Sequence, residues 1–472
     1  MTFLTVLLQG GSSGVLREKL QAVLGPLWKS ERVSPARVII TGFLLLILLG
    51  TVLLMLPFST REWGGASFFD ALFTATSATC VTGLVVHDTV SYWSGFGQVV
   101  ILFLIQVGGM GVVTMAVAIS IFSGKRIGLK QRWVMQESIS APQVGGIVRM
   151  TDFILKTAFA IEGAGAAVLA VRFCPKFGLW RGLWYSVFHA VSAFCNAGFD
   201  LMGEEAPYAS LTAFAGDPVV NVMVILLVVV GGLGFLTWQD VASRHLHFKE
   251  YRLQSKIILV TTAGLLLFGF FFFLLYEFRL PQWDGMTAGE KALAALFQSV
   301  TPRTAGFNTV ELARLSEPGK LLTILLMLTG GSPGSTAGGF KTTTFAVLLL
   351  SAIAVFRRRR SAQCFGRRVQ DSALQNASAI FMLYILLFLA GGILICCADG
   401  VPLMDALFEA ASAIGTVGLS LGGTARFSTF SRLVLIFLMY FGRVGGLTLI
   451  YAVTAGNGAS ASQFPQEQVT VG

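Results

Sequence analysis

The chain alternates long and short apolar segments, with polar residues between them. Eight of the long segments could cross a hydrocarbon core of about 30 Å as helices that rise 1.5 Å per residue. Their length and near absence of charge predict an integral membrane protein made of helices. The predicted spans are Val38–Leu56, Gln98–Phe122, Phe153–Phe173, Val219–Trp238, Ile257–Tyr276, Leu321–Phe356, Ile380–Cys397 and Leu433–Val453.

A shorter apolar segment lies between the two spans of each successive pair. As helices these segments are too short to cross the bilayer, so we expect them to enter it and return on the same side. The predicted short helices are Phe68–Thr79, Leu183–Phe194, Ala292–Val300 and Leu403–Ile414.

Each short helix is followed by a few mostly small residues that end in a glycine. These glycines are Gly83, Gly198, Gly306 and Gly418, and they recur at intervals of about 110 residues. A motif that returns at a long, regular interval indicates a repeated structural unit. We therefore predict an all-α integral membrane protein in which four span–pore-helix–span repeats surround a pseudo-fourfold pore.

The repeats divide the chain into six predicted parts. These are an N-terminal segment at 1–37, repeats at 38–122, 151–241, 255–356 and 377–453, and a tail at 454–472. Basic residues cluster after the second spans, as in Arg357–Arg360. The positive-inside rule then predicts a multi-pass protein of the cytoplasmic membrane with both termini in the cytoplasm, and glycine loops that enter from the outer face.

Composition agrees with a membrane protein and argues against other classes. The sequence is 54% hydrophobic and 12% charged, whereas soluble proteins carry roughly 25% charged residues. The net charge of +10 is spread between apolar segments, so it does not predict a nucleic-acid surface. The six cysteines show no CxxC spacing and are expected to be buried free thiols.

The four glycine loops could form a cation filter. Backbone at membrane depth must pack in protein or line water, because each unpaired N–H or C=O costs several kcal/mol in hydrocarbon. Four loops around one axis could replace the hydration shell of K⁺ with backbone carbonyls, and no carboxylate ring suggests a divalent ion. The alternative is that these glycines are helix caps or close-packing sites. The predicted filter residues are Cys80, Val81, Thr82, Gly83, Cys195, Asn196, Ala197, Gly198, Arg303, Thr304, Ala305, Gly306, Gly415, Thr416, Val417 and Gly418.

The second span of the third repeat is interrupted by proline and glycine. A helix cannot continue through this stretch, so we expect a flexible loop at 330–344 that lies under the filter and gates it. The alternative is a static kink. Lys341 either binds the carbonyls of this loop or lies in the cytoplasmic vestibule. The predicted gating-loop residues are Gly330, Gly331, Ser332, Pro333, Gly334, Ser335, Thr336, Ala337, Gly338, Gly339 and Lys341.

Three further charged residues fall at apolar depth. Arg443 lies inside the last span, where a charge normally faces a protein interior or a water path. Glu162 and Glu409 are expected to make structural hydrogen bonds rather than to bind ions, and Glu409 could accept from N–H groups of the filter backbone.

Two stretches resemble KtrB-type subunits of the Trk/Ktr/HKT superfamily of cation transporters. Gly330–Thr344, with the sequence GGSPGSTAGGFKTTT, is similar to their intramembrane loop, and Met439–Thr448 is similar to their last span. The tail Phe464–Gly472 is also KtrB-like. The absence of an extra helix pair before Val38 favours a KtrB-type over a TrkH-type protein.

The resemblance implies potassium uptake, often stimulated by sodium. It also implies a homodimer with one pore per subunit and a cytoplasmic ring of nucleotide-binding RCK subunits of the KtrA type that opens the gate. By resemblance, Arg443 points into the pore below the filter, and glycine rather than serine at Gly83 favours K⁺ over Na⁺. Arg303 and the third filter, which is one residue shorter, are expected to break the fourfold symmetry.

Three other classes compete with this interpretation. A TrkH-type transporter is the nearest. A secondary transporter of an organic solute is disfavoured, because the repeats are parallel and only one span is predicted to be broken. A membrane enzyme is not expected, since no HExxH or Ser/His motif is present. No organic cofactor is expected on this chain.

Overall fold

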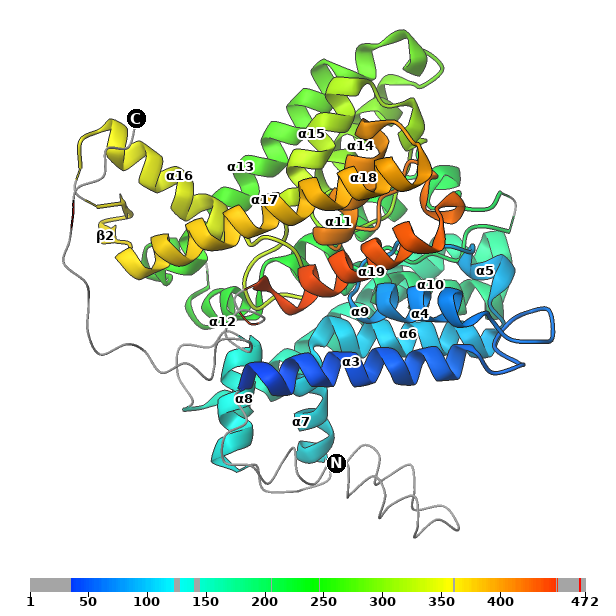
Figure 1. Ribbon diagram of the computed structural model, residues 1–472, viewed down its shortest axis with the longest axis horizontal. Helices are drawn as coiled ribbons and strands as arrows, with labels where there is room; N and C mark the ends of the chain where they lie inside the picture. The colour runs from blue at the N-terminus through cyan, green and yellow to red at the C-terminus, as the bar shows by residue number, and fades with distance from the viewer. Residues whose placement is uncertain are drawn as a thin grey trace.

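The computed structural model describes residues 35–122, 128–139, 145–204, 206–245, 247–359, 361–446, 448 and 467. It is almost entirely helical (Figure 1). Most of the predicted segment 1–37 and of the predicted tail 454–472 lies outside these residues. Within them, the helices group into four successive sets, each made of a long helix, a short helix and a second, interrupted helix.

The helix bounds follow the predicted repeats closely. In repeat order the helices are α3 (Pro35–Leu54), α4 (Phe68–Thr79), α6 (Gly95–Met110) and α7 (Val112–Phe122); α9 (Ile147–Phe177), α10 (Leu179–Phe194), α11 (Pro218–Gly232) and α12 (Phe235–Arg244); α13 (Leu253–Leu275), α14 (Ala288–Val300), α15 (Glu317–Leu328) and α16 (Thr342–Phe356); and α17 (Asp371–Asp399), α18 (Leu403–Ile414) and α19 (Thr429–Val444). Smaller elements connect them: α5 (Thr89–Tyr92), α8 (Leu129–Ile139) and the antiparallel pair β1 (Gln363–Cys364) and β2 (Arg367–Arg368).

The long helices have the length and apolarity of membrane spans. In the described part of the chain, α3, α9, α13 and α17 qualify singly, and α11 with α12 qualifies as a pair bent by 98°. Helices α9 and α17 extend beyond the predicted spans by about one turn or more at each end. The protein is therefore a helical membrane protein, as the apolar pattern predicts.

The second helix is broken in every repeat, not only in the third. Helix α6 ends at Gly111 (φ +88°), α11 and α12 are separated at Gly234 (φ +90°), and α19 ends at Gly445 (φ +89°). The prediction of a single broken span was wrong. An isolated glycine in an apolar run is a weak signal, because glycine is tolerated inside helices as well as at their ends.

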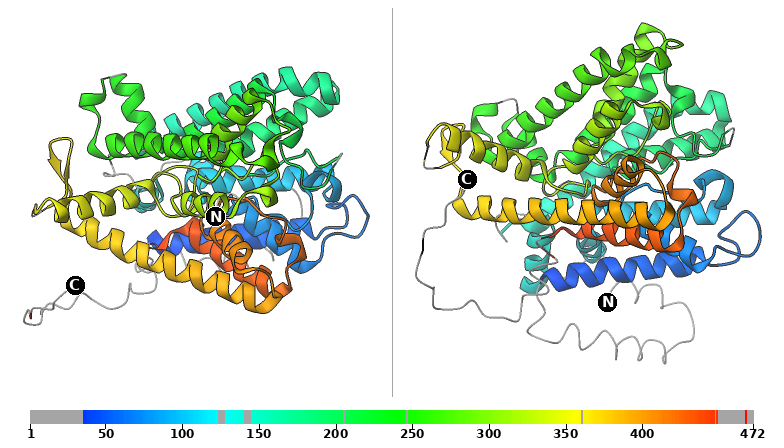
Figure 2. Two further views of the ribbon diagram at one scale, coloured as in Figure 1. Left: turned by 90° about the horizontal axis from the view of Figure 1, so that it is seen from above. Right: turned by 45° about the horizontal axis from the view of Figure 1, so that its top comes forward.

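The same helix contact recurs at each junction between repeats. The second helix of one repeat packs on the short helix of the next: α6 on α10, α11 on α14, and α15 on α18. The contact between α19 and α4 closes the circle, so the first and last repeats are neighbours (Figure 1 and Figure 2). The four short helices consequently converge, and the loops that follow them meet at the centre of the protein.

Candidate functional site

The four repeated glycines form a closed ring. A Cβ atom placed on Gly83 would lie 2.4 Å from the carbonyl oxygen of Ala197 and 3.0 Å from Cα of Gly198. A Cβ on Gly198 would lie 2.8 Å from Cα of Gly306. Neighbouring loops are thus in backbone contact, with no room for a side chain.

The other half of the ring closes in the same way. A Cβ on Gly306 would lie 2.4 Å from the carbonyl oxygen of Val417, and one on Gly418 would lie 2.1 Å from that of Thr82. The glycines therefore meet in the cyclic order 83, 198, 306, 418, at one level of the structure. This contact explains why all four positions need glycine, and the alternative that they are unrelated caps does not fit the arrangement.

The residue two positions before each glycine has a left-handed backbone. The φ angles are +57° at Val81, +59° at Asn196, +64° at Thr304 and +49° at Thr416. Such angles are rare for β-branched residues and persist only where the surrounding structure enforces them. The four loops thus share one conformation, in which a left-handed residue and a left-handed glycine alternate with ordinary residues.

Side chains from the short helices hold the loops in this conformation. The Oγ of Ser77 accepts from the N–H of Gly83 at 3.1 Å, and the Oγ of Ser412 accepts from that of Gly418 at 3.0 Å. The Oγ of Ser192 donates to the carbonyl of Phe199 at 2.7 Å. These serines precede the glycines at one fixed spacing, a signal that sequence reasoning missed.

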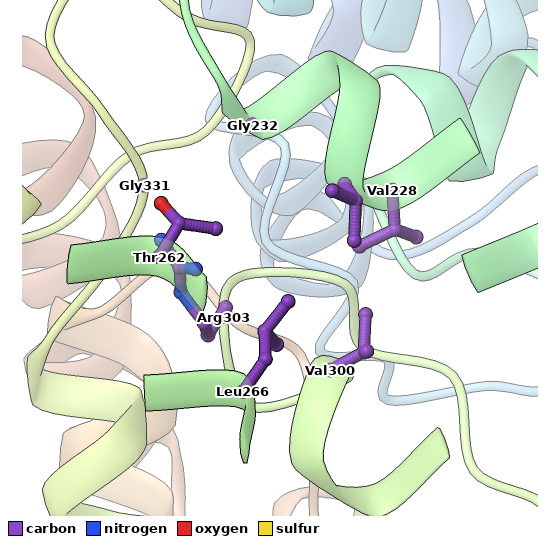
Figure 3. A pocket seen from close by; sticks show the side chains of 8 residues that line it. Val228, Gly232, Thr262, Leu266, Val300, Arg303 and Gly331 are labelled. Carbon is purple, nitrogen blue, oxygen red and sulfur yellow. The ribbon is translucent and has the colours of Figure 1, made fainter. Parts of the chain in front are cut away.

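The third loop departs from the pattern, as its shorter length predicts. Its anchor, Thr301, donates to the carbonyl of Phe307 and lies one residue nearer to its glycine than the serines do. The side chain of Arg303 leaves the ring and lines a small cavity behind the loop together with Thr262 and Gly331 (Figure 3). The backbone of Arg303 belongs to the predicted filter, but its guanidinium does not.

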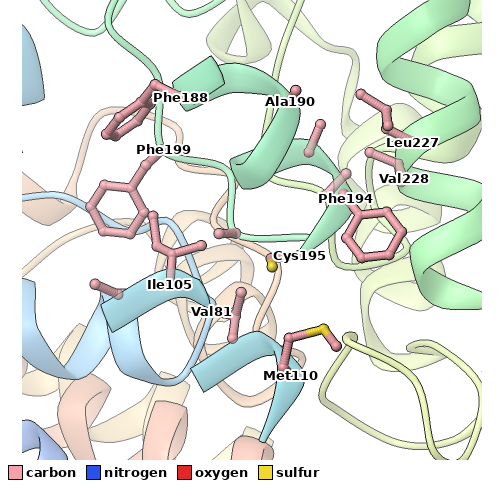
Figure 4. Close-up of a cluster of buried hydrophobic side chains, with 14 of the residues drawn as sticks. Val81, Ile105, Met110, Phe188, Ala190, Phe194, Cys195, Phe199, Leu227 and Val228 are labelled. Carbon is pink, nitrogen blue, oxygen red and sulfur yellow. The ribbon is translucent and has the colours of Figure 1, made fainter. Parts of the chain in front are cut away.

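Polar networks support the second and fourth loops. Glu162 on α9 accepts from the amide of Gln106 at 3.1 Å, and the thiol of Cys195 lies 3.9 Å from the same carboxylate. Figure 4 shows Cys195 and Val81 within the apolar cluster that encloses these loops. The prediction of a structural hydrogen bond for Glu162 is confirmed.

Glu409 on α18 plays the corresponding part beside the fourth loop. Its carboxylate accepts from the hydroxyls of Ser420 at 2.6 Å and Thr424 at 2.7 Å. It also accepts from the N–H of Leu421 at 3.0 Å, three residues beyond Gly418. The predicted structural role and the predicted bond to backbone N–H are both present.

The interrupted segment between α15 and α16 lies directly against the glycine ring. The hydroxyl of Thr336 bonds to Oδ1 of Asn196 at 2.9 Å and to the carbonyl of Phe194 at 3.0 Å. A Cβ on Gly338 would lie 2.1 Å from Oγ1 of Thr416. The predicted gating loop therefore contacts the second and fourth filter loops.

The loop is also tied to the neighbouring second helices. The N–H of Ser332 donates to the carbonyl of Gly232 at 3.0 Å, and the N–H of Gly339 donates to that of Gly442 at 3.1 Å. The N–H of Phe235 donates to the carbonyl of Gly334 at 2.7 Å. These acceptors and donors are available because α11 and α19 end nearby.

Two cations hold the loop by its carbonyls. Arg443 donates to the carbonyl of Thr336 and to those of Gly108 and Gly109, at 2.9 Å for the last. Lys341 donates to the carbonyl of Ala337 at 2.9 Å. Of the two alternatives for Lys341, the structure has the bond to the loop. Arg443 joins the loop to the end of α6.

A cavity of ≈ 340 Å³ opens on the other side of the ring. All four ring glycines line it, and its wall carries the side chains of Asp88, Asp200, Glu311 and Arg426. Burial, with a contribution from the charge of Asp88, raises the pKa of Asp200 to about 7. The glycine ring therefore separates this acidic cavity from the loop held by Arg443.

The fold and this arrangement define a class of protein: a four-repeat membrane protein in which loops from each repeat meet on a central axis. A profile of the cation transport protein family TrkH matches residues 34–457. The chain belongs to this family, and its relatives are cation transporters rather than enzymes.

Similar proteins cover nearly the whole chain. It is 39% identical to the potassium/sodium uptake protein NtpJ of Enterococcus hirae, over 94% of this chain and 98% of that protein. It is 38% identical to Ktr system potassium uptake protein B of Bacillus subtilis, over the same shares. The crystal structure of the potassium transporter TrkH from Vibrio parahaemolyticus has the same fold, with a TM-score of 0.71 at 20% identity over 97% of this chain and 95% of that chain.

Proposed function

We propose that this chain takes up potassium ions across the cytoplasmic membrane through the glycine ring. The observation that carries the proposal is the closed ring of four identical loop conformations, whose last carbonyls before each glycine face the neighbouring loop. Backbone carbonyls at this spacing can replace the hydration shell of a monovalent cation. The printed names of the relatives, potassium/sodium uptake and potassium uptake, support the same cation.

The remaining parts of the proposal concern direction and control. The acidic cavity faces the outside and both chain ends face the cytoplasm, as the basic segments require. Entry is driven by the membrane potential, which contributes about 2.3 kcal/mol per charge per 100 mV. The loop under the ring, bound by Arg443 and Lys341, is the gate, and its release opens the path.

Partners and stimulation follow from the similarity to Ktr systems. We infer that the chain works as a homodimer with one pore in each subunit and that a cytoplasmic ring of nucleotide-binding RCK subunits displaces the loop. Sodium stimulation belongs to the same proposal. Among the described residues, no cluster of three metal-ligating side chains offers a separate metal site, so K⁺ at the ring carbonyls is the expected ion.

Growth of a potassium-uptake-deficient bacterium tests this function. The chain is expected to restore growth at low external K⁺, more strongly with Na⁺ present. Serine in place of Gly83, Gly198, Gly306 or Gly418 is expected to weaken the rescue and to lower the preference for K⁺ over Na⁺. A chain that reaches the membrane but restores no growth at any K⁺ concentration would refute the proposal.

Uptake is expected to depend on pH through Asp200. Its pKa is raised to about 7, so this carboxyl is mostly ionised at pH 8 and mostly neutral at pH 6. The ionised form attracts cations into the cavity beside the ring. Initial rates of ⁸⁶Rb⁺ uptake at limiting concentration are therefore expected to fall a few-fold between pH 8 and pH 6.

Asp200→Asn is expected to remove most of this pH dependence and to give a low rate at both pH values. Asp284→Asn is the matched control, because Asp284 is an exposed carboxylate outside the cavity. A pH dependence that persists in Asp200→Asn would assign the titration to another group.

A further inference from the structure

Two buried polar groups without partners face each other behind the third loop. Arg303 is only 7% exposed and Thr262, on α13, only 6%. Nε of Arg303 and Oγ1 of Thr262 have no hydrogen-bond partner among the described residues. Figure 3 shows the guanidinium beside the threonine, at the cavity that both residues line.

The charge of Arg303 is also uncompensated within the described part of the chain. No carboxylate there forms an ion pair with it, and no carbonyl accepts from it. Arg443, by contrast, has three carbonyl acceptors. A buried charge is costly unless it is paired, so the surroundings of Arg303 call for an anionic or strongly accepting ligand.

Size and lining restrict what this ligand can be. The cavity of ≈ 10 Å³ has room for about one particle of the size of a water molecule. Apart from Arg303, Thr262 and two glycines, the wall is apolar and consists of Val228, Val229, Val300 and Leu266. A phosphate or carboxylate is too large, whereas a monatomic anion fits a site with one cation, one hydroxyl donor and an apolar wall.

We propose that this cavity binds one halide ion, chloride under physiological conditions, between the guanidinium of Arg303 and the hydroxyl of Thr262. The bound anion offsets a positive charge that lies three residues from Gly306 and would otherwise oppose K⁺ at the ring. It also lies beside Gly331, at the start of the proposed gating loop. The site thus links chloride to potassium uptake, and this link rests on the proposed function.

Binding itself is tested with bromide as the probe. The purified full-length protein is kept at constant K⁺ and ionic strength while gluconate is replaced by bromide. The unfolding midpoint is expected to rise saturably by about 2 to 4 °C. Crystals grown in bromide are expected to show one anomalous peak at Arg303.

Variants separate the site from general salt effects. Arg303→Gln and Thr262→Val are expected to lose the bromide shift, and Thr262→Ser, which keeps the hydroxyl, to retain it. Arg61→Gln removes an exposed arginine and is expected to behave as the wild type. The proposal is overturned if the wild type shows neither shift nor peak, which would mean that water alone occupies the cavity, or if Arg303→Gln keeps the shift. If Arg303→Gln does not fold, the two threonine variants decide.

The transport readout uses proteoliposomes. Replacing chloride with gluconate is expected to slow ⁸⁶Rb⁺ uptake several-fold in the wild type and to leave Arg303→Gln unchanged. Equal dependence in both proteins would overturn the link between anion and uptake. Bromide binding without any ⁸⁶Rb⁺ uptake would instead refute the proposed function and leave the anion site standing.

Discussion

Gly418→Ala is expected to abolish potassium uptake while leaving the protein in the membrane. The new Cβ would lie 2.1 Å from the carbonyl oxygen of Thr82, well inside van der Waals contact. A φ of +91° adds a cost of about 1–2 kcal/mol for an L-residue. Since the ring is closed, one displaced carbonyl disturbs its neighbour as well, and the ion loses its coordination.

Gly422→Ala is the matched control. Gly422 has almost the same φ, +90°, but a Cβ there would meet nothing within 4 Å. The two variants share the backbone cost and differ only in the contact across the ring. ⁸⁶Rb⁺ uptake per immunodetected protein is expected to be lost in Gly418→Ala and nearly normal in Gly422→Ala. Equal rates in the two variants would show that ring closure does not limit uptake.

Arg443→Gln is expected to raise the rate of uptake and to weaken its control. The guanidinium fastens the loop at Thr336 to the end of α6 at Gly108 and Gly109. A hydrogen bond from a charged group contributes about 1.5–3 kcal/mol, so losing one shifts the position of the loop by roughly tenfold or more. Removing the positive charge also removes a barrier to K⁺ below the ring.

Single-channel or flux measurements with and without the regulatory subunits provide the test. Uptake without those subunits is expected to rise by about tenfold in Arg443→Gln, in line with the shift of the loop. Arg432→Gln is the control, because Arg432 lies on the same helix but pairs with Asp70 at 3.1 Å, far along α19 from the loop. Wild-type rate and control in Arg443→Gln would exclude the loop contact as the restraint.

Much of this architecture could be predicted from the sequence because it rests on long-range periodicity. The four glycines mark the ring, and the proline and glycines of 330–339 mark the loop, since neither stretch can continue a helix. Arg443 could be placed because a charge in an apolar segment must face an interior. These signals depend on residue type alone.

Other features depend on how the repeats fit together and left no such signal. Nothing in the residue type of Val81 or Thr416 predicts a left-handed backbone, which the neighbouring loops impose. The direction of the Arg303 side chain is set by the space between α11 and α13, two repeats apart in its lining. The breaks at Gly111 and Gly234 were missed because a glycine is equally common in packed helices.

The contact between α19 and α4 has a consequence for biogenesis. Three of the four junctions form between repeats that follow each other along the chain, but this one joins the last repeat to the first. A nascent chain that has inserted only three repeats lacks the segment that completes the ion path. The membrane therefore stays sealed against leakage until synthesis is nearly finished, and a chain truncated before Thr429 gives an inactive protein rather than an open hole.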